Sequence, residues 1–216
     1  MLHTHVYSPE SPTGPVVLAI HGLTGRGARW ASLAAGPLAH RRVVAPDLLG
    51  HGRSPWEPPW GIDDNVAALS DVIDALIPTT DRPIVIVGHS YGGAIAVRLA
   101  AHRPADVAGL VLLDPAQGLD PATALRLATD SVADPGYADA AEAKAAKRSE
   151  GWAEVADEHL DTEIAEHLIP TDDGRVGWRV CTPATAVAWS DMAREAVLPP
   201  AGIPTTVVVA DHEHSD

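Results

Sequence analysis

The chain has 216 residues, 46% of them hydrophobic and 20% charged, which is enough for one sizeable buried core. Its net charge of -14 argues against binding to nucleic acids and to anionic membrane surfaces, both of which attract clustered lysine and arginine. No charged-then-apolar leader opens the chain, and no apolar run approaches membrane-spanning length. We therefore expect a cytoplasmic protein with no nucleic-acid or membrane partner.

Apolar, β-branched runs alternate with helical patterns over the first half of the chain. Apolar residues recur at helical spacing over 27–40 and 62–77, and residues 94–102 also have the pattern of a helix. Because parallel strands covered on both faces are continuously apolar, these runs favour an α/β fold with a doubly wound, mainly parallel sheet. The predicted strands are residues 15–20, 42–46, 83–87, 108–113 and, after a long interval, 205–210.

Two glycines flank Ser90 where a predicted strand meets a predicted helix, in Gly88-His89-Ser90-Tyr91-Gly92-Gly93. A serine in this pattern and context is typical of a nucleophile elbow, a turn that exposes the serine Oγ at the carboxyl edge of a sheet. The turn is so sharp that the serine needs an unfavourable backbone conformation, and we predict for Ser90 a φ that is positive or otherwise unusual for serine. Ser90 is therefore the predicted nucleophile.

A glycine-containing loop, His21-Gly22-Leu23-Thr24-Gly25, follows the first predicted strand. Such a loop can offer the backbone N–H of Leu23 to an oxyanion, with the N–H of Tyr91 as the second donor. His21 and Gly22 are expected to shape the same substrate-binding region. The alternative is an ordinary glycine-rich turn between a strand and a helix.

A second loop, Asp47 to Ser54, follows the next strand, and we expect a structural role for it, in which Asp47 or Ser54 bonds local backbone groups. His51 is interpreted as a loop histidine rather than a catalytic one.

In chain order, His21-Gly22, Asp47 to Ser54, Gly88 to Gly93 and Leu110 to Pro115 resemble the motifs of the α/β-hydrolase superfamily. The resemblance is to its esterase, lactonase and cofactor-free peroxidase branch, over residues 15–116 and more loosely over 203–211. It implies a serine hydrolase that cleaves a small ester, lactone or amide through an acyl-enzyme, without a cofactor or a metal. It also implies that residues 1–116 and 201–216 form the hydrolase core.

Residues 117–200 match no motif, and the resemblance interprets them as a mainly helical cap over the catalytic pocket. Helices are expected near 121–130, 137–149, 152–168 and 183–197, with a turn at 174–177. Trp152, Trp178, Trp189, Leu168 and Met192 are candidates to line an apolar pocket or to pack the cap. The alternative is a set of surface helices that do not contact substrate.

The sequence offers several candidates for the acid and for the base of a catalytic triad. Asp114, directly after a predicted strand, is the favoured acid, and Asp211 and Glu213 are the alternatives. His212 and His214 are the best candidates for the base, although a chain terminus holds a side chain poorly.

The superfamily's chain order calls for one more strand and a histidine loop after residue 210, and the sequence contains neither. The fold is therefore expected to be C-terminally incomplete and the chain to be a poor hydrolase. The alternative function is a truncated or impaired protein that at most binds a small ligand. The last strand is then an unprotected edge, through which we expect self-association.

Overall fold

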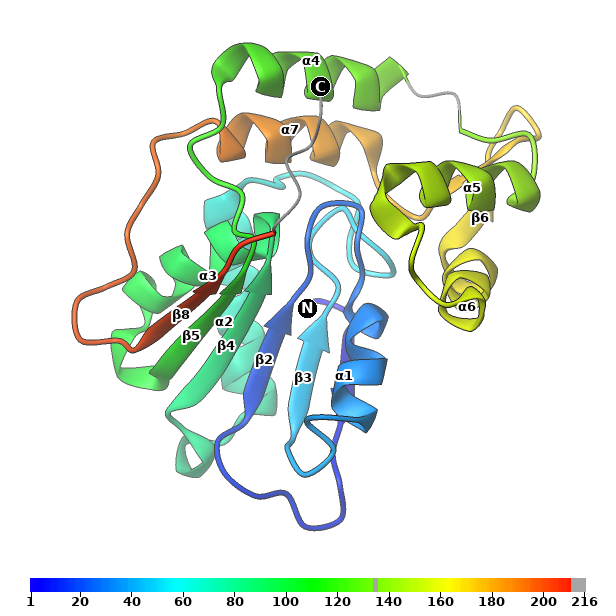
Figure 1. Ribbon diagram of the computed structural model, residues 1–216. Helices are drawn as coiled ribbons and strands as arrows, with labels where there is room; N and C mark the ends of the chain where they lie inside the picture. Colours follow the sequence, from blue (N-terminus) through cyan, green and yellow to red (C-terminus); the bar gives the residue numbers. More distant parts are fainter. Residues whose placement is uncertain (134–135, 211–216) are drawn as a thin grey trace.

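The computed structural model describes residues 1–133 and 136–210, and a six-stranded sheet lies at its centre (Figure 1). Across the sheet the order is β1-β3-β2-β4-β5-β8, and every neighbouring pair is parallel except β1 with β3. Helices cover both faces of the sheet, so the predicted α/β fold is confirmed. The strands are β1 (Thr4–Tyr7), β2 (Val17–Ile20), β3 (Val43–Pro46), β4 (Ile84–His89), β5 (Val107–Leu113) and β8 (Thr205–Val208).

The helices of the core lie in the connections between the strands. The first connection holds a 3₁₀ turn, η1 (Gly27–Trp30), and the short α1 (Ala31–Ala35). Helix α2 (Ile62–Leu76) follows β3, and α3 (Tyr91–His102) follows β4 directly. The short 3₁₀ turns η2 (Thr79–Asp81) and η3 (Pro104–Asp106) precede β4 and β5.

Residues 117–200 lie at the carboxyl edge of the sheet. In Figure 1, α4 and α7 cross above the ends of the strands, while α5, α6 and β6 form a group at one side. None of the helices among the described residues is long and apolar enough to cross a membrane. The elements are α4 (Pro121–Ala133), α5 (Ala140–Lys147), a π-helical turn η4 (Arg148–Trp152), α6 (Asp157–His167), β6 (Leu168–Pro170), β7 (Val176–Trp178) and α7 (Thr182–Met192).

Three features differ from the sequence-based expectations. β1 was not predicted, since it is only four residues long and two of them are polar. The helix expected over 27–40 ends at Ala35, because the chain leaves the helix at Gly36. The turn expected at 174–177 lies earlier, where the N–H of Gly174 donates to the carbonyl of Thr171, and residues 176–178 pair with β6 instead. Three-residue strands are too short to produce a periodic signal.

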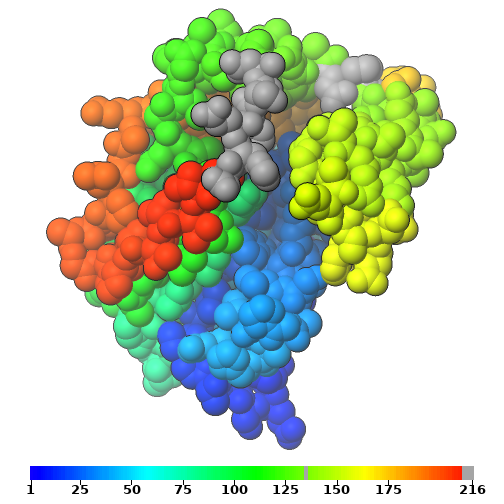
Figure 2. Space-filling model, viewed as in Figure 1, coloured from blue at the N-terminus to red at the C-terminus, as the bar shows by residue number. Residues whose placement is uncertain are grey.

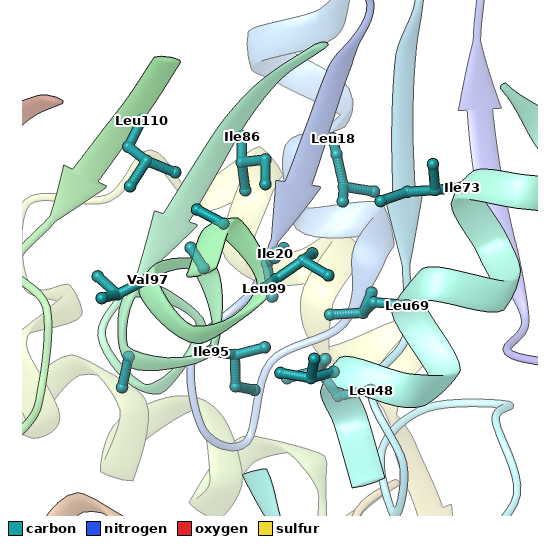
Figure 3. Packing of buried hydrophobic residues seen from close by; sticks show 14 of the residues in the cluster. Leu18, Ile20, Leu48, Leu69, Ile73, Ile86, Ile95, Val97, Leu99 and Leu110 are labelled. Carbon is teal, nitrogen blue, oxygen red and sulfur yellow. The ribbon is translucent and has the colours of Figure 1, made fainter. Parts of the chain in front are cut away.

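The main core lies between the sheet and the helices α2 and α3 (Figure 3). Alternate residues of each strand point to this face, and the residues between them point to a smaller core under η1 and α1. Burial of each large aliphatic side chain contributes roughly 1.5–3 kcal/mol, so this packing holds the end of β4 and the start of α3 in place. The labelled side chains from strands are Leu18, Ile20, Ile86 and Leu110, and those from helices are Leu69, Ile73, Ile95, Val97 and Leu99.

β8 is an edge strand of the described sheet, and its valines are exposed on both of its faces. Val207 is 52% exposed, and Val208 is 50% exposed. An apolar edge of this kind pairs readily with another strand, so we expect the protein to self-associate at high concentration. A lysine at an edge opposes such pairing, and the Val207→Lys variant should stay monomeric in sedimentation velocity at concentrations where the wild type dimerises. A concentration-independent monomer in the wild type would contradict this expectation.

Candidate active site

Ser90 occupies a strained turn between β4 and α3. Its φ is 51° and its ψ is -120°, a conformation that side-chain-bearing residues rarely adopt, and the predicted positive φ is confirmed. The N–H of Ser90 donates to the carbonyl of Leu113 at 2.9 Å, and its carbonyl accepts the N–H of Gly93 at 2.8 Å. These bonds hold the turn between the ends of β5 and α3. Ser90 is only half-buried, so its hydroxyl lies near the surface at the carboxyl edge of the sheet.

The glycines around Ser90 are required by close backbone contacts. A Cβ on Gly92 would lie 2.4 Å from the carbonyl oxygen of His21 and 2.5 Å from that of Ile20. A Cβ on Gly88 would lie 2.5 Å from the carbonyl oxygen of Gly92. No side chain fits at these distances, so the glycines let α3 pack directly against the strands.

We expect the Gly92→Ala variant to lose stability although alanine is the better helix former. Helix propensity alone predicts a gain of about 1 kcal/mol, whereas the clash with two carbonyl oxygens costs roughly 1–3 kcal/mol or more. The net result should be a lower urea midpoint. Gly177→Ala is the matched control, since its Cβ would meet only the flexible end of Thr171 at 3.3 Å. Equal midpoints for both variants would contradict the steric argument.

The loop that carries Leu23 passes directly against Ser90. A Cβ on Gly22 would lie 3.0 Å from the Cβ of Ser90 and 2.8 Å from Nδ1 of His89. Within the described residues, neither the N–H of Leu23 nor that of Tyr91 donates a hydrogen bond to another residue. The two predicted oxyanion donors, the N–H groups of Leu23 and Tyr91, are therefore both without a hydrogen-bond acceptor in the described part of the chain. The loop that carries Leu23 borders Ser90. Their role in catalysis stays a prediction.

His21 is a neutral structural histidine in this arrangement. Its Nε2 accepts the N–H of Leu48 at 2.9 Å, which leaves Nδ1 as the protonated nitrogen, donating to the carbonyl of Gly22 at 2.8 Å. Burial and the neighbouring His51 lower the pKa of His21 well below 6.5. Because both nitrogens are engaged, His21 shapes the loop and has no lone pair to offer Ser90.

Asp47 has the structural role expected for its loop. Its Oδ1 accepts the N–H of Gly27 at 2.7 Å, and its Oδ2 accepts the N–H of Arg53 at 2.9 Å. Ser54 Oγ donates to the carbonyl of Asp47 at 2.6 Å. His51, in the same loop, is buried and its Nδ1 donates to the carbonyl of Leu49 at 2.9 Å, which agrees with a loop histidine.

Asp114, the favoured acid, lies at the end of β5, next to the end of β8. Its φ is 45°, its side chain is exposed, and its N–H donates to the carbonyl of Val208 at 2.6 Å. Its Oδ1 accepts the N–H of Ala210 at 3.4 Å. Ala210, whose N–H contacts Asp114, precedes His212 by two residues in the sequence. Asp211, Glu213, His212 and His214 themselves lie outside the described residues.

None of the described histidines is hydrogen-bonded to Ser90 Oγ. His89 is exposed and borders a cavity of about 220 Å³ with Gly22 and Arg29, and Ser90 is not in the lining of this cavity. His102 is exposed at the far end of α3, and His167 packs on Trp178 in the cap. The structure therefore brings none of the described histidines into hydrogen-bonding contact with Ser90 Oγ, and the base of the predicted triad is not found among them.

Sequence reasoning missed a buried ion-pair cluster that ties the loop after Leu23 to α6. Glu163, 3% exposed, accepts from Arg29 at 2.6 Å and from Arg26 at 3.2 Å. Figure 2 shows the yellow residues of α6 lying against the blue N-terminal part of the core. Burial opposes the charge of Glu163, but Arg29, His167 and Arg26 together outweigh it, and the pKa of the carboxyl is lowered. A local sequence pattern cannot predict a contact between residues that are more than 130 positions apart in the chain.

A cavity of about 280 Å³ lies between this loop and the cap. Thr24 lines it on the core side, and Trp56, Trp178 and Val180 supply apolar wall. Of the tryptophans considered for a pocket, Trp178 is thus at a cavity, whereas Trp189 donates to Ser131 Oγ at 3.0 Å within the cap. The cavity therefore lies beside Thr24, the residue after Leu23, whose N–H is a predicted oxyanion donor.

Comparison with known proteins agrees with the fold. The family model described as the alpha/beta hydrolase fold matches residues 15–155. The chain is 49% identical to Lipase LipV of Mycobacterium tuberculosis over 209 residues, which cover 97% of this chain and 78% of the relative.

Solved structures share the fold of this chain. A thioesterase domain from the curacin biosynthetic pathway has a TM-score of 0.72 and 27% identity, over 96% of this chain and 78% of that one. The enol-lactonase from Burkholderia xenovorans LB400 has a TM-score of 0.75 and 19% identity, over 98% of this chain and 78% of that one. The chain belongs to the α/β hydrolase fold family.

Proposed function

We propose that this protein is a serine hydrolase that cleaves a small-molecule ester, lactone or amide through an acyl-enzyme on Ser90. The observation that carries the proposal is the strained turn at Ser90, which is formed at the cost of an unfavourable φ of 51°. The 49% identity to a protein named as a lipase favours esters among these substrates.

In the proposed mechanism, Ser90 Oγ attacks the substrate carbonyl carbon and transfers its proton to a histidine base. The carbonyl oxygen becomes an oxyanion, which the N–H groups of Leu23 and Tyr91 stabilise. The base returns the proton to the leaving group, and water then hydrolyses the acyl-enzyme by the same steps. His212 or His214 would be the base and Asp114 the acid, with Asp211 and Glu213 as alternatives.

A second candidate function is binding of a small ligand without efficient turnover. It is favoured by the engagement of both nitrogens of His21 and by the absence of a hydrogen bond between Ser90 Oγ and any described histidine. In that case the cavity at Trp178 would hold a ligand, but Ser90 would remain a neutral hydroxyl.

Covalent labelling with a fluorophosphonate probe separates the two functions. A serine hydrolase is labelled rapidly at the peptide that contains Ser90, and the same preparation hydrolyses aryl esters. Slow labelling of Ser90 without ester turnover would favour the second candidate. Labelling of the Ser90→Ala variant, or of another peptide, would refute Ser90 as the nucleophile.

A further inference from the structure

One group of metal-ligating side chains lies away from Ser90. The imidazole nitrogens of His3 and His5 and a carboxylate oxygen of Asp47 all lie within 4.8 Å of one another, and this is the only such group among residues 1–133 and 136–210. Asp47 is buried, and the two histidines are partly buried. Between β1 and the nucleophile strand β4 lie β3 and β2, so this cluster is distinct from the candidate active site.

Strand pairing brings the three side chains together. β1 pairs with β3 so that His5 is opposite Ala45, and the same antiparallel register continues to His3 opposite Asp47. The N–H of Asp47 donates to the carbonyl of His3 at 2.8 Å, which confirms this step of the register. Residues two apart on a strand share a face, and residues directly opposite across a pair share it too.

The carboxylate is held in position by backbone donors. Gly27 and Arg53 each donate an N–H to one oxygen of Asp47, and each oxygen keeps a further lone pair for a metal. The N–H of His3 donates to Ser54 Oγ at 2.9 Å, which fixes the start of β1. Outer hydrogen bonds of this kind orient metal ligands.

The histidines leave one side of the cluster open. His5 Nε2 lies 3.8 Å from Asp47 Oδ1, and the side chain of His5 is 30% exposed. His5 and Asp47 border a cavity of about 440 Å³ that can admit an ion and its water. Arg26, Arg53 and Arg179 also line it, and their positive charges oppose cation binding, while Glu166 adds a second carboxylate to the lining.

We propose that His3, His5 and Asp47 bind one zinc ion, with water in the fourth position. Two imidazoles with a carboxylate suit zinc, whereas calcium and magnesium prefer oxygen ligands. Zinc ligands at about 2.0–2.1 Å from the ion lie roughly 3.4 Å apart, so ligand atoms that lie within 4.8 Å of one another need to approach by at most about 1.4 Å. The ion would join the edge strand β1 to β3 and so stabilise the fold.

The test uses the 216-residue chain without an affinity tag and zinc chloride as the probe. Isothermal titration should give one site with a micromolar Kd, and cobalt in its place should show the visible absorption of a low-coordinate nitrogen–oxygen site. Zinc at 100 times its Kd should raise Tm by roughly 5–10 °C. His3→Ala and His5→Ala should each weaken binding at least tenfold.

The controls assign the binding to the cluster. His40→Ala and His102→Ala remove exposed histidines elsewhere and should bind zinc as the wild type does. The His212→Ala/His214→Ala double variant should bind zinc normally too, since its histidines are not part of the cluster. The proposal is wrong if zinc binding survives in His3→Ala and His5→Ala, or if it is lost only in the double variant. Circular dichroism of each metal-free variant verifies that it is folded.

Discussion

The Ser90→Ala variant should lower kcat/KM for a short-chain aryl ester by about 1,000-fold or more. The acyl-enzyme cannot form without the Oγ nucleophile, and the remaining rate would come from substrate binding and the oxyanion donors alone. Because Ser90 is half-buried and its side chain is not part of the core, the variant should keep the wild-type Tm. Relief of the strained φ by alanine is not expected, since alanine also has a Cβ.

Release of p-nitrophenolate from p-nitrophenyl acetate and butyrate measures this effect. Ser32→Ala is the matched control, an exposed serine on α1 that should keep wild-type activity. The His212→Ala/His214→Ala variant tests the base, and a loss similar to that of Ser90→Ala would assign it to one of these two histidines. If Ser90→Ala retains the wild-type rate, the observed hydrolysis does not proceed through Ser90.

We also expect the protein to unfold in mild acid, because three histidines are buried in their neutral form. Burial is the largest cause for each of them, and it lowers the pKa of His51 to about 4, that of His167 to about 3 and that of His21 well below 6.5. In the unfolded chain these groups titrate near the ordinary value of 6.5.

The direction of the pH effect follows from proton uptake. Below pH 6.5 the unfolded chain binds protons that the folded chain does not, so the stability that is complete above pH 6.5 falls as the pH is lowered toward the folded pKa values. In this range each histidine lowers the free energy of unfolding by about 1.4 kcal/mol for each pH unit of acidification. Together the three lower it by about 4 kcal/mol per pH unit. Since a domain is stable by about 5–15 kcal/mol, this slope places the midpoint of unfolding at about pH 5.3 for a stability at the lower limit and below about pH 4 for a stability at the upper limit.

Urea unfolding at several pH values between pH 7.5 and pH 4.5 measures how steeply the free energy of unfolding changes with pH. His167→Phe keeps a ring to stack on Trp178 and removes one titrating group, so it should reduce the slope by about a third. His102→Ala, at an exposed position, is the control and should keep the wild-type slope. A urea midpoint that stays constant over this pH range would show that these histidines are protonated in the folded protein.

Local sequence determined the sheet, its main helices and the strained turn at Ser90. Each strand from β2 to β5 is a short apolar run, and the turn depends on glycines that are close together in the chain. Steric exclusion around a backbone is a property of neighbouring residues, and it can be read from the sequence without knowledge of distant contacts. The same reasoning predicted the structural role of Asp47.

Only the tertiary structure decided which side chains gather around these elements. Arg29 meets Glu163, and His3 meets Asp47, across long stretches of chain. The tautomer of His21 follows from a donor, Leu48, that no local pattern assigns to it. These contacts depend on strand register and on how the cap lies over the core, which are set by the summed burial of many distant residues rather than by any one segment.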